Sequence, residues 1–210
     1  MIIEVLTEGA SDVPVIREVL SRHFSLDEHV DFRIHPHRGR GNIPADVHAQ
    51  PHPRHRGLLD QLPAKLRGFG RYMGDQFLVL VLIDADNDDS ESLLANLNSM
   101  LEQLLIRPSR VLFRLAIEET ESWFLADKDA LRDAFPKANL VLIRDIAADS
   151  RVGAWERLAE CLGRNTAEVT GSDKTYWAEA ISPHLNFDAP HSPSLGQLIT
   201  GLKGELAPEA

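Results

Sequence analysis

The chain has 210 residues, 43% hydrophobic and 26% charged, and its formal net charge of −10 argues against indiscriminate binding to polyanions. One cysteine, Cys161, excludes an internal disulfide framework, and no apolar run approaches the roughly 20 residues that span a bilayer. The amino terminus lacks a basic segment followed by a long apolar stretch, so we expect no signal peptide, no membrane association and a cytoplasmic location.

The first unit of the chain reads as strand, turn and helix. Residues 2–6 are rich in β-branched side chains, Gly9 permits a tight turn, and an amphipathic helix is predicted from there to about His23. This pattern places Glu8 at the carboxyl end of the first strand. Glu8 is therefore either a partner in a site at the sheet edge or a turn residue that the helix dipole favours.

A basic loop follows a short predicted strand at residues 31–34. Residues 35–56 are rich in Pro, Gly, His and Arg, and residues 33–71 contain eight Lys or Arg against two acids. We predict phosphate or nucleic-acid contacts from the arginines of this loop, which are Arg38, Arg40, Arg54 and Arg56. The alternatives are a solvated loop and a zinc site, although the histidines lack ligand spacing on a helix and have no cysteine nearby.

The central segment combines a buried strand with an acid cluster. Seven apolar residues from Phe77 to Ile83 are typical of a strand covered on both faces, after a predicted helix over residues 58–69. Four acids follow, namely Asp84, Asp86, Asp88 and Asp89. Alternation along an extended chain points Asp84 and Asp86 the same way, where their charges repel unless a cation lies between them. The alternative is a solvated acidic turn.

A second acidic strand end follows a strong helical stripe over residues 93–105. The apolar run 111–117 predicts a further strand, and it ends in Glu118, Glu119 and Glu121. Right-handed β-α-β crossovers place the carboxyl ends of such strands at one edge of the sheet. In open α/β sheets that edge is where ligands bind, so we expect these acids to meet Glu8 and Asp84 there.

The chain from Asp127 onward is predicted to be mainly helical. Helices are indicated over residues 129–135, 152–162 and 170–181, whereas Leu140 to Ile143 predicts a short edge strand. Lys174 is either a surface charge or a phosphate contact. We predict an α/β core over residues 1–126 and a helical extension over 127–210, packed together as one compact domain.

Rival uses of the central acids are less consistent with the sequence. A calcium-binding loop starting at Asp84 requires Gly at its sixth position and Glu at its twelfth, where this chain has Asp89 and Ala95. A phosphatase with an aspartate nucleophile usually carries its Asp-x-Asp motif on the first strand, whereas the motif of this chain, Asp84-Ala-Asp86, follows a later strand. The sequence contains neither of the Gly-rich motifs that bind nucleotides, Gly-x-x-x-x-Gly-Lys-Ser/Thr and Gly-x-Gly-x-x-Gly.

Three segments together resemble a known family. They are Leu6-Thr-Glu-Gly-Ala-Ser-Asp12, Ile83-Asp-Ala-Asp86 and Ala116-Ile-Glu-Glu-Thr-Glu-Ser-Trp-Phe-Leu-Ala-Asp127. The pattern resembles the Toprim domain of topoisomerases, primases and OLD-type nucleases. More closely, it is similar to small uncharacterised bacterial Toprim-like proteins of the domain of unknown function 4276 type. The resemblance implies an open, mostly parallel sheet of about four strands flanked by helices, with Mg²⁺ or Mn²⁺ held at its edge.

The residues and the resemblance together lead to one functional expectation and one alternative. We expect a Mg²⁺- or Mn²⁺-dependent phosphoryl-transfer enzyme that cleaves nucleic acid, with Glu8, Asp84 and Asp86 as catalytic metal ligands. Further metal ligands are expected from Asp88, Glu119 and Glu121, and phosphate contacts from the loop arginines and Lys174. The alternative is a non-catalytic Toprim-like module that binds metal or nucleic acid, or that joins a protein partner in a defence or repair complex.

Overall fold

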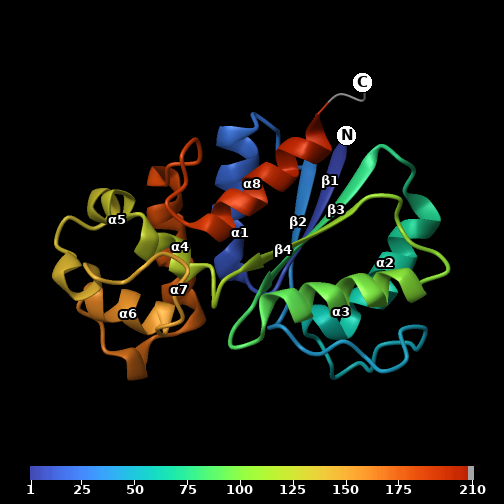
Figure 1. Ribbon diagram of the computed structural model, residues 1–210, viewed down its shortest axis with the longest axis horizontal. Helices are drawn as coiled ribbons and strands as arrows, with labels where there is room; N and C mark the ends of the chain where they lie inside the picture. Colours follow the sequence, from blue (N-terminus) through green and yellow to red (C-terminus); the bar gives the residue numbers. More distant parts are fainter. Residues whose placement is uncertain (208–210) are drawn as a thin grey trace.

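The protein is built on a four-stranded sheet in which all strands run parallel (Figure 1). The computed structural model describes residues 1–207. The strands are β1 (Ile2–Thr7), β2 (Phe32–Pro36), β3 (Phe77–Asp84) and β4 (Val111–Ala116), in the order β2-β1-β3-β4 across the sheet. The predicted α/β class and the parallel sheet of four strands are therefore confirmed.

The sequence of β3 explains its central place. Its even-numbered residues from Leu78 to Leu82 enter one hydrophobic core, and its odd-numbered residues from Val79 to Ile83 enter the other. Successive side chains of a strand point to opposite faces, so only a strand covered on both faces can be apolar at every position. An uninterrupted apolar run is therefore the sequence signature of this strand.

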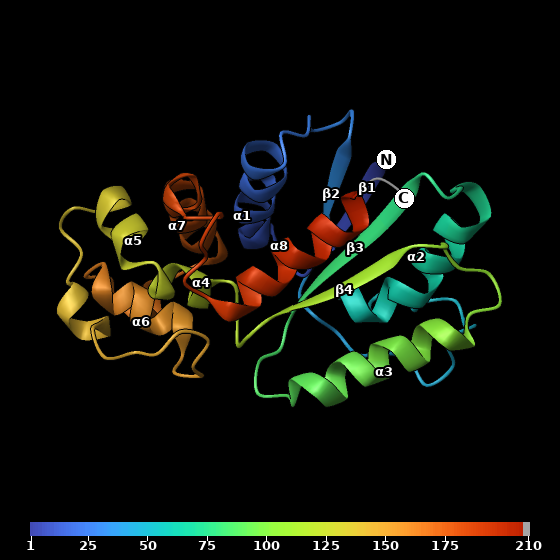
Figure 2. The ribbon, with the colours of Figure 1, turned by 45° about the horizontal axis from the view of Figure 1, so that its top comes forward.

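Helices cover both faces of the sheet. On one face lie α2 (Leu58–Tyr72) and α3 (Ser90–Gln103); on the other lie α1 (Val13–Glu18), continued by the π-helical η2 (Val19–His23), and α8 (Pro193–Leu206). Figure 2 shows the two pairs on opposite sides of the strands. The helices leave the carboxyl edge of the strands free for other elements.

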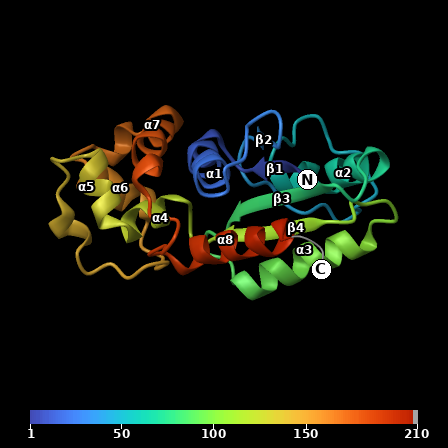
Figure 3. The same cartoon turned by 90° about the horizontal axis from the view of Figure 1, so that it is seen from above.

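A group of short helices lies beyond that carboxyl edge (Figure 3). It contains α4 (Glu121–Ala126), α5 (Lys128–Ala134), α6 (Ala154–Cys161) and α7 (Gly171–Ile181). Its buried side chains join the same core as β1 and α1, since Trp123, Leu158 and Trp177 belong to one cluster with Ile3. Helix α7 packs against the turn Ala10–Asp12 after β1 and against α1, so the helical group lies at the edge of the sheet where the acids were predicted to meet. Short 3-10 turns complete the described chain: η1 (Ala10–Asp12), η3 (Leu140–Ile143), η4 (Thr166–Glu168) and η5 (Ser182–His184).

One predicted element is wrong. Leu140–Ile143 forms the 3-10 turn η3 rather than an edge strand. Within this turn Val141 and Leu142 are exposed and Ile143 alone is buried, in the core shared with the helical group. An isolated apolar tetrapeptide can satisfy its backbone in a turn, as Leu142 N does by donating to Asn139 O at 3.2 Å.

Helix α8 was expected only as part of a mainly helical region. Its buried residues are spaced as an amphipathic helix requires, namely Leu195, Leu198, Ile199 and Leu202. Three glycines interrupt that signal, and at Gly201 an added Cβ would lie 2.1 Å from the guanidinium of Arg114 on β4. The close approach of helix and strand therefore requires a residue type that weakens the helical pattern.

The long loop between β2 and α2 is tied down at its base. Gly39 N donates to Glu8 O at 2.9 Å, Leu58 N donates to Gly39 O at 2.8 Å, and Leu59 N donates to Arg40 O at 2.7 Å. These bonds hold the first residues of the loop beside the carboxyl end of β1. Among the helices of residues 1–207, none combines the length and the apolar character needed to cross a membrane.

Candidate functional site

Five carboxylates from three segments gather at the carboxyl edge of the sheet. Glu8 and Asp12 follow β1, Asp84 ends β3, and Glu119 and Glu121 follow β4. Asp84 N donates to Glu8 Oε1 at 3.0 Å, and the charges of Asp12, Glu8, Glu121 and Glu119 all act on Asp84. We call these five residues the acid cluster. The strand order explains it, because β3 lies between β1 and β4.

Asp12 is a member of the acid cluster that was not among the metal ligands predicted from the sequence. It is buried, and its carboxylate accepts hydrogen bonds from Gly9 N at 2.9 Å and from Thr120 Oγ1 at 3.0 Å. The second bond links the turn after β1 to the start of α4. A signal was present in the sequence, since a second acid stands four residues after Glu8 in the same turn.

Lys174 reaches the acid cluster from α7. Its Nζ lies 3.0 Å from Glu119 Oε2, 3.6 Å from Glu121 Oε1 and 4.8 Å from the ring centre of Trp155. Burial opposes the charged form of Lys174, but Glu121 and Glu119 raise its pKa above the usual value. In the structure Lys174 therefore forms ion pairs with Glu119 and Glu121, and a phosphate contact by the same side chain stays a prediction.

The acid cluster holds more negative charge than its surroundings compensate. Burial raises the pKa of Glu8 to about 8, with further increases from Asp12 and Asp86. Burial also raises the pKa of Glu119 to about 7, and Glu121 adds to that increase. The pKa of Asp84 is raised well above its usual value by burial and then by the neighbouring acids. Glu121 is 3% exposed, yet its Oε1 accepts no hydrogen bond.

Asp86 and Asp88 lie outside the acid cluster, on the exposed turn after β3. The strand ends at Asp84 and Asp86 has a left-handed φ of 45°, so the alternation that predicted a shared direction no longer applies. Arg40 of the basic loop donates to Asp86 Oδ2 at 3.1 Å and also to Asp88. Asp86 remains near the acid cluster, because its charge contributes to the raised pKa of Glu8.

Glu118, the first acid after β4, is engaged in holding α6. Its carboxylate accepts three backbone N–H groups, from Val152 at 3.1 Å, Gly153 at 2.7 Å and Ala154 at 3.1 Å. Glu118 itself has a left-handed φ of 63°, and its carbonyl accepts a hydrogen bond from Asp86 N at 2.9 Å. These contacts explain why its side chain points away from Glu119 and toward the helical group.

The chemistry of the acid cluster suits a hard divalent cation. All its ligand atoms are carboxylate oxygens, which Mg²⁺ and Mn²⁺ prefer, and the buried Glu121 Oε1 has no donor. Over residues 1–207, however, no three His, Cys, Asp or Glu side chains are placed to share one ion. The acid cluster therefore suits a divalent cation by the type and charge of its ligand atoms. Binding of the ion requires the carboxylate side chains to rearrange.

Two of the other predicted loop arginines, Arg38 and Arg56, lie at the base of the loop between β2 and α2. Arg38 follows β2, and its backbone N donates to Arg56 O at 3.3 Å across the base of the loop. Arg54 lies nearby and is exposed, with its backbone N bonded to His52 Nδ1 at 3.2 Å. Of the four loop arginines, Arg40 is the one that the structure brings to the acidic edge.

Comparison with known proteins identifies a family. A search of curated proteins and a search of solved structures each returned no match. The family described as Domain of unknown function (DUF4276) matches residues 7–203, which include every residue of the acid cluster and Lys174. The chain therefore belongs to the DUF4276 family.

Proposed function

We propose that the protein is a Mg²⁺- or Mn²⁺-dependent phosphoryl-transfer enzyme that hydrolyses phosphodiesters of nucleic acid. The observation that carries this proposal is the buried Glu121 Oε1, which accepts no hydrogen bond and shares the single ammonium of Lys174, 3.6 Å away, with the other acids of the cluster. Burying a charged oxygen without a donor is costly unless a cation or a proton compensates it. A divalent cation would compensate several members of the acid cluster at once.

The elements around the acid cluster have separate tasks in this proposal. Glu8, Asp84 and Glu121 would hold the ion, which supplies charge stabilisation at the phosphorus centre and an activated water molecule. Lys174 keeps Glu119 in place through its 3.0 Å contact, and the helical group closes one side of the edge. The basic loop would hold the polyanion, since Gly39 N anchors it directly to Glu8 O.

We also propose that the likeness to Toprim domains reflects a shared site. The support is the pair of acids that such domains use, a glutamate after the first strand and an aspartate after a later one, here Glu8 and Asp84. Their hydrogen bond of 3.0 Å is consistent with a common role. Asp86 differs from that pattern, because it is exposed and paired with Arg40. Asp12 and Glu121 would take its place near the ion.

A non-catalytic role is the second candidate, and one observation favours it. Lys174 already lies within ion-pair distance of two acids, 3.0 Å from Glu119 and 3.6 Å from Glu121. A lysine in that position can neutralise part of the acid cluster without a metal. The protein would then bind nucleic acid or a protein partner in a larger complex without cleaving a bond.

A digestion panel tests the proposal. Purified protein is incubated with single- and double-stranded DNA and RNA in the presence of Mg²⁺, Mn²⁺ or a chelator. We expect metal-dependent cleavage that Asp84→Asn and Glu121→Gln each reduce by about a hundredfold or more. Asp129→Asn is the matched control, because Asp129 is an exposed acid on α5 that pairs with Arg132.

The outcomes separate the two candidates. Cleavage that survives both cluster variants would place the chemistry elsewhere in the chain. Nucleic-acid binding without cleavage under any of the metal conditions would favour the non-catalytic role.

A further inference from the structure

We infer that a basic pocket beside the acid cluster binds one phosphate group. The pocket lies at the base of the loop between β2 and α2 and has a volume of about 280 Å³. Its polar lining comes from His37, Arg38, Arg56, Gln61 and Lys65. We call these residues the basic pocket. Arg38 and Arg56 were predicted from sequence as phosphate contacts, whereas the other three residues were not.

The fold builds the basic pocket from three segments that the backbone joins. The start and the end of the loop meet where Arg38 N donates to Arg56 O at 3.3 Å. Gln61 and Lys65 lie four residues apart on α2, so their side chains share one face of that helix. The pocket therefore lies between the two ends of the loop, which a backbone hydrogen bond joins, and one face of α2.

The cations of the basic pocket lack the acidic partners that neighbouring cations have. Arg33 pairs with Glu4, and Arg40 pairs with Asp86 and Asp88. By contrast, Arg38, Arg56 and Lys65 form no ion pair with any residue from 1 to 207. Burial alone lowers the pKa of Lys65, as expected where an ammonium loses water without gaining an anion. A bound phosphate would supply that anion.

His37 adds a polar group that has no partner in the protein. Its Nδ1 lies 2.9 Å from the carbonyl oxygen of Thr7, which can only accept, so Nδ1 carries the proton. Its Nε2 is buried and has no hydrogen-bond partner among the described residues. Neutral His37 therefore has a free acceptor and lines the same pocket as Arg38, Arg56 and Lys65. That combination fits the hydroxyl of a monoprotonated phosphate or of an adjoining sugar.

Size and position define the ligand class. Pockets for whole small-molecule ligands measure about 300–1,000 Å³, so about 280 Å³ suits a phosphate group with few attached atoms. His37 N donates to Thr7 O at 3.0 Å, and Gly39 N donates to Glu8 O at 2.9 Å. The phosphate would thus lie next to the acid cluster on the β2 side. The inference that this phosphate belongs to a nucleic-acid substrate rests on the proposed function, whereas the inference that the pocket binds a phosphate group does not.

Binding measured without metal tests the inference. Fluorescence anisotropy in a chelator compares labelled single strands carrying a 5′-phosphate or a 5′-hydroxyl, and inorganic phosphate serves as the competitor. We expect Lys65→Ala and Arg38→Ala each to weaken binding about tenfold and to reduce its salt dependence by about one phosphate contact. Arg71→Ala on α2 is the matched control, because Arg71 is exposed on the same helix as Lys65 and lies outside the pocket.

The outcomes distinguish the source of the phosphate. A preference for the phosphorylated strand that Lys65→Ala removes identifies a terminal phosphate, and equal losses for both strands identify an internal one. Equal affinities for Lys65→Ala, Arg38→Ala and the Arg71→Ala control, with unchanged melting temperatures, would overturn the inference. The assay contains no metal and measures no cleavage, so failure of the cleavage proposal would not be mistaken for failure of the pocket.

Discussion

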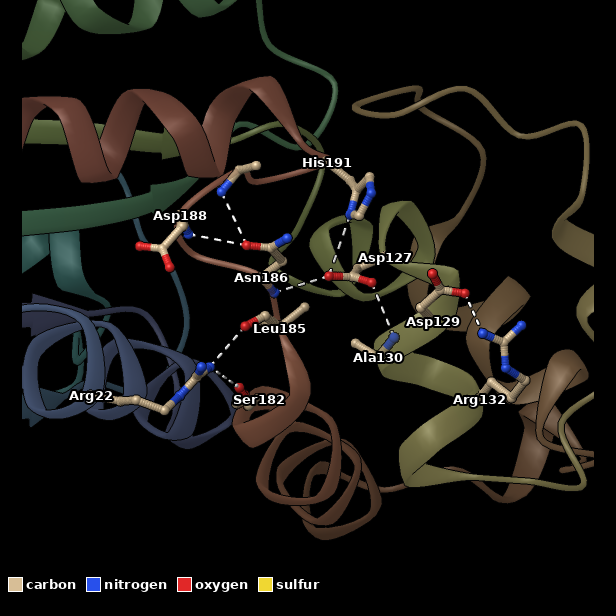
Figure 4. A network of polar contacts seen from close by, with 11 residues as sticks. Arg22, Asp127, Asp129, Ala130, Arg132, Ser182, Leu185, Asn186, Asp188 and His191 are labelled. Atoms are coloured by element: carbon tan, nitrogen blue, oxygen red, sulfur yellow. Dashed lines mark hydrogen bonds and ion pairs between the residues drawn. The ribbon is translucent and has the colours of Figure 1, made fainter.

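Two equally buried carboxylates in this protein, Asp127 and Glu121, have different hydrogen-bond environments. Asp127, at the start of α5, is 4% exposed, and Glu121 in the acid cluster is 3% exposed. Asp127 accepts hydrogen bonds from Ala130 N and Asn186 N, each at 3.0 Å, and His191 Nδ1 lies 3.4 Å from its Oδ2 (Figure 4). Glu121 Oε1 accepts none. The two side chains are thus almost equally buried, but hydrogen-bond donors reach both carboxylate oxygens of Asp127 and do not reach Oε1 of Glu121.

The difference indicates what each group does. A buried carboxylate that receives backbone N–H donors is held as a structural connection, here between α5 and the segment after α7. Glu121 has one buried oxygen without a hydrogen bond, and the ammonium of Lys174, 3.6 Å from that oxygen, is shared among the acids of the cluster, so its charge destabilises the fold unless a further cation compensates it. In the proposed function that compensation is a metal ion, so the acid cluster lowers the stability of the metal-free protein in favour of binding.

The largest effect is expected at Asp127. Replacing Asp127 by Ala leaves the buried donor Ala130 N and the part-buried donor Asn186 N without their acceptor, and an unsatisfied buried donor costs about 1–3 kcal/mol. We therefore expect Asp127→Ala to lower the free energy of unfolding by about 2–4 kcal/mol in urea titrations. Asp127→Asn keeps one acceptor oxygen and should lose less. A loss below that of the exposed control Asp129→Asn would contradict the structural role of Asp127.

The opposite sign is expected at Asp84. The folded protein raises the pKa of Asp84, so at neutral pH folding either takes up a proton or buries a repelled charge. Asp84→Asn removes that penalty at nearly constant shape. We expect a gain of about 1 kcal/mol, which moves the melting temperature of a domain this size up by about 2–4 °C. The measurement is calorimetric melting in a chelator, and an Asp84→Asn protein that melts lower than its parent would disagree with the account.

A pH-dependent effect should also follow from Glu8 and Glu119. Their pKa values are raised from 4.5 to about 8 and about 7, so between about pH 4.5 and 8 the folded state binds protons that the unfolded state has released. Stability of the metal-free protein should therefore fall as the pH rises through that window. Glu8→Gln should flatten the decline. Urea midpoints measured from pH 5 to 8 in a chelator check this, and a rising trend due to Glu8 would contradict it.

The sequence predicted the architecture where local patterns and tertiary structure agree. The apolar run of β3 and the acids at three strand ends were sufficient to predict a parallel sheet with an acidic edge. The fine structure of that edge was not accessible from alternation alone, because Asp86 adopts a left-handed conformation that depends on Glu118 of the next strand end. Lys174 is 90 residues from Asp84 in the chain, and only the packing of α7 against η1, the turn after β1, brings it near the acid cluster.

Calorimetric titration of the protein with Mn²⁺ tests the central claim most directly. The account predicts binding to the parent protein and to Asp129→Asn with equal affinity, and no detectable binding to Asp84→Asn. Mn²⁺ should also raise the melting temperature of the parent while leaving Asp84→Asn unchanged, because only a protein that binds the ion gains the binding free energy. Equal binding and equal stabilisation of the parent and Asp84→Asn would contradict a metal centre at the acid cluster.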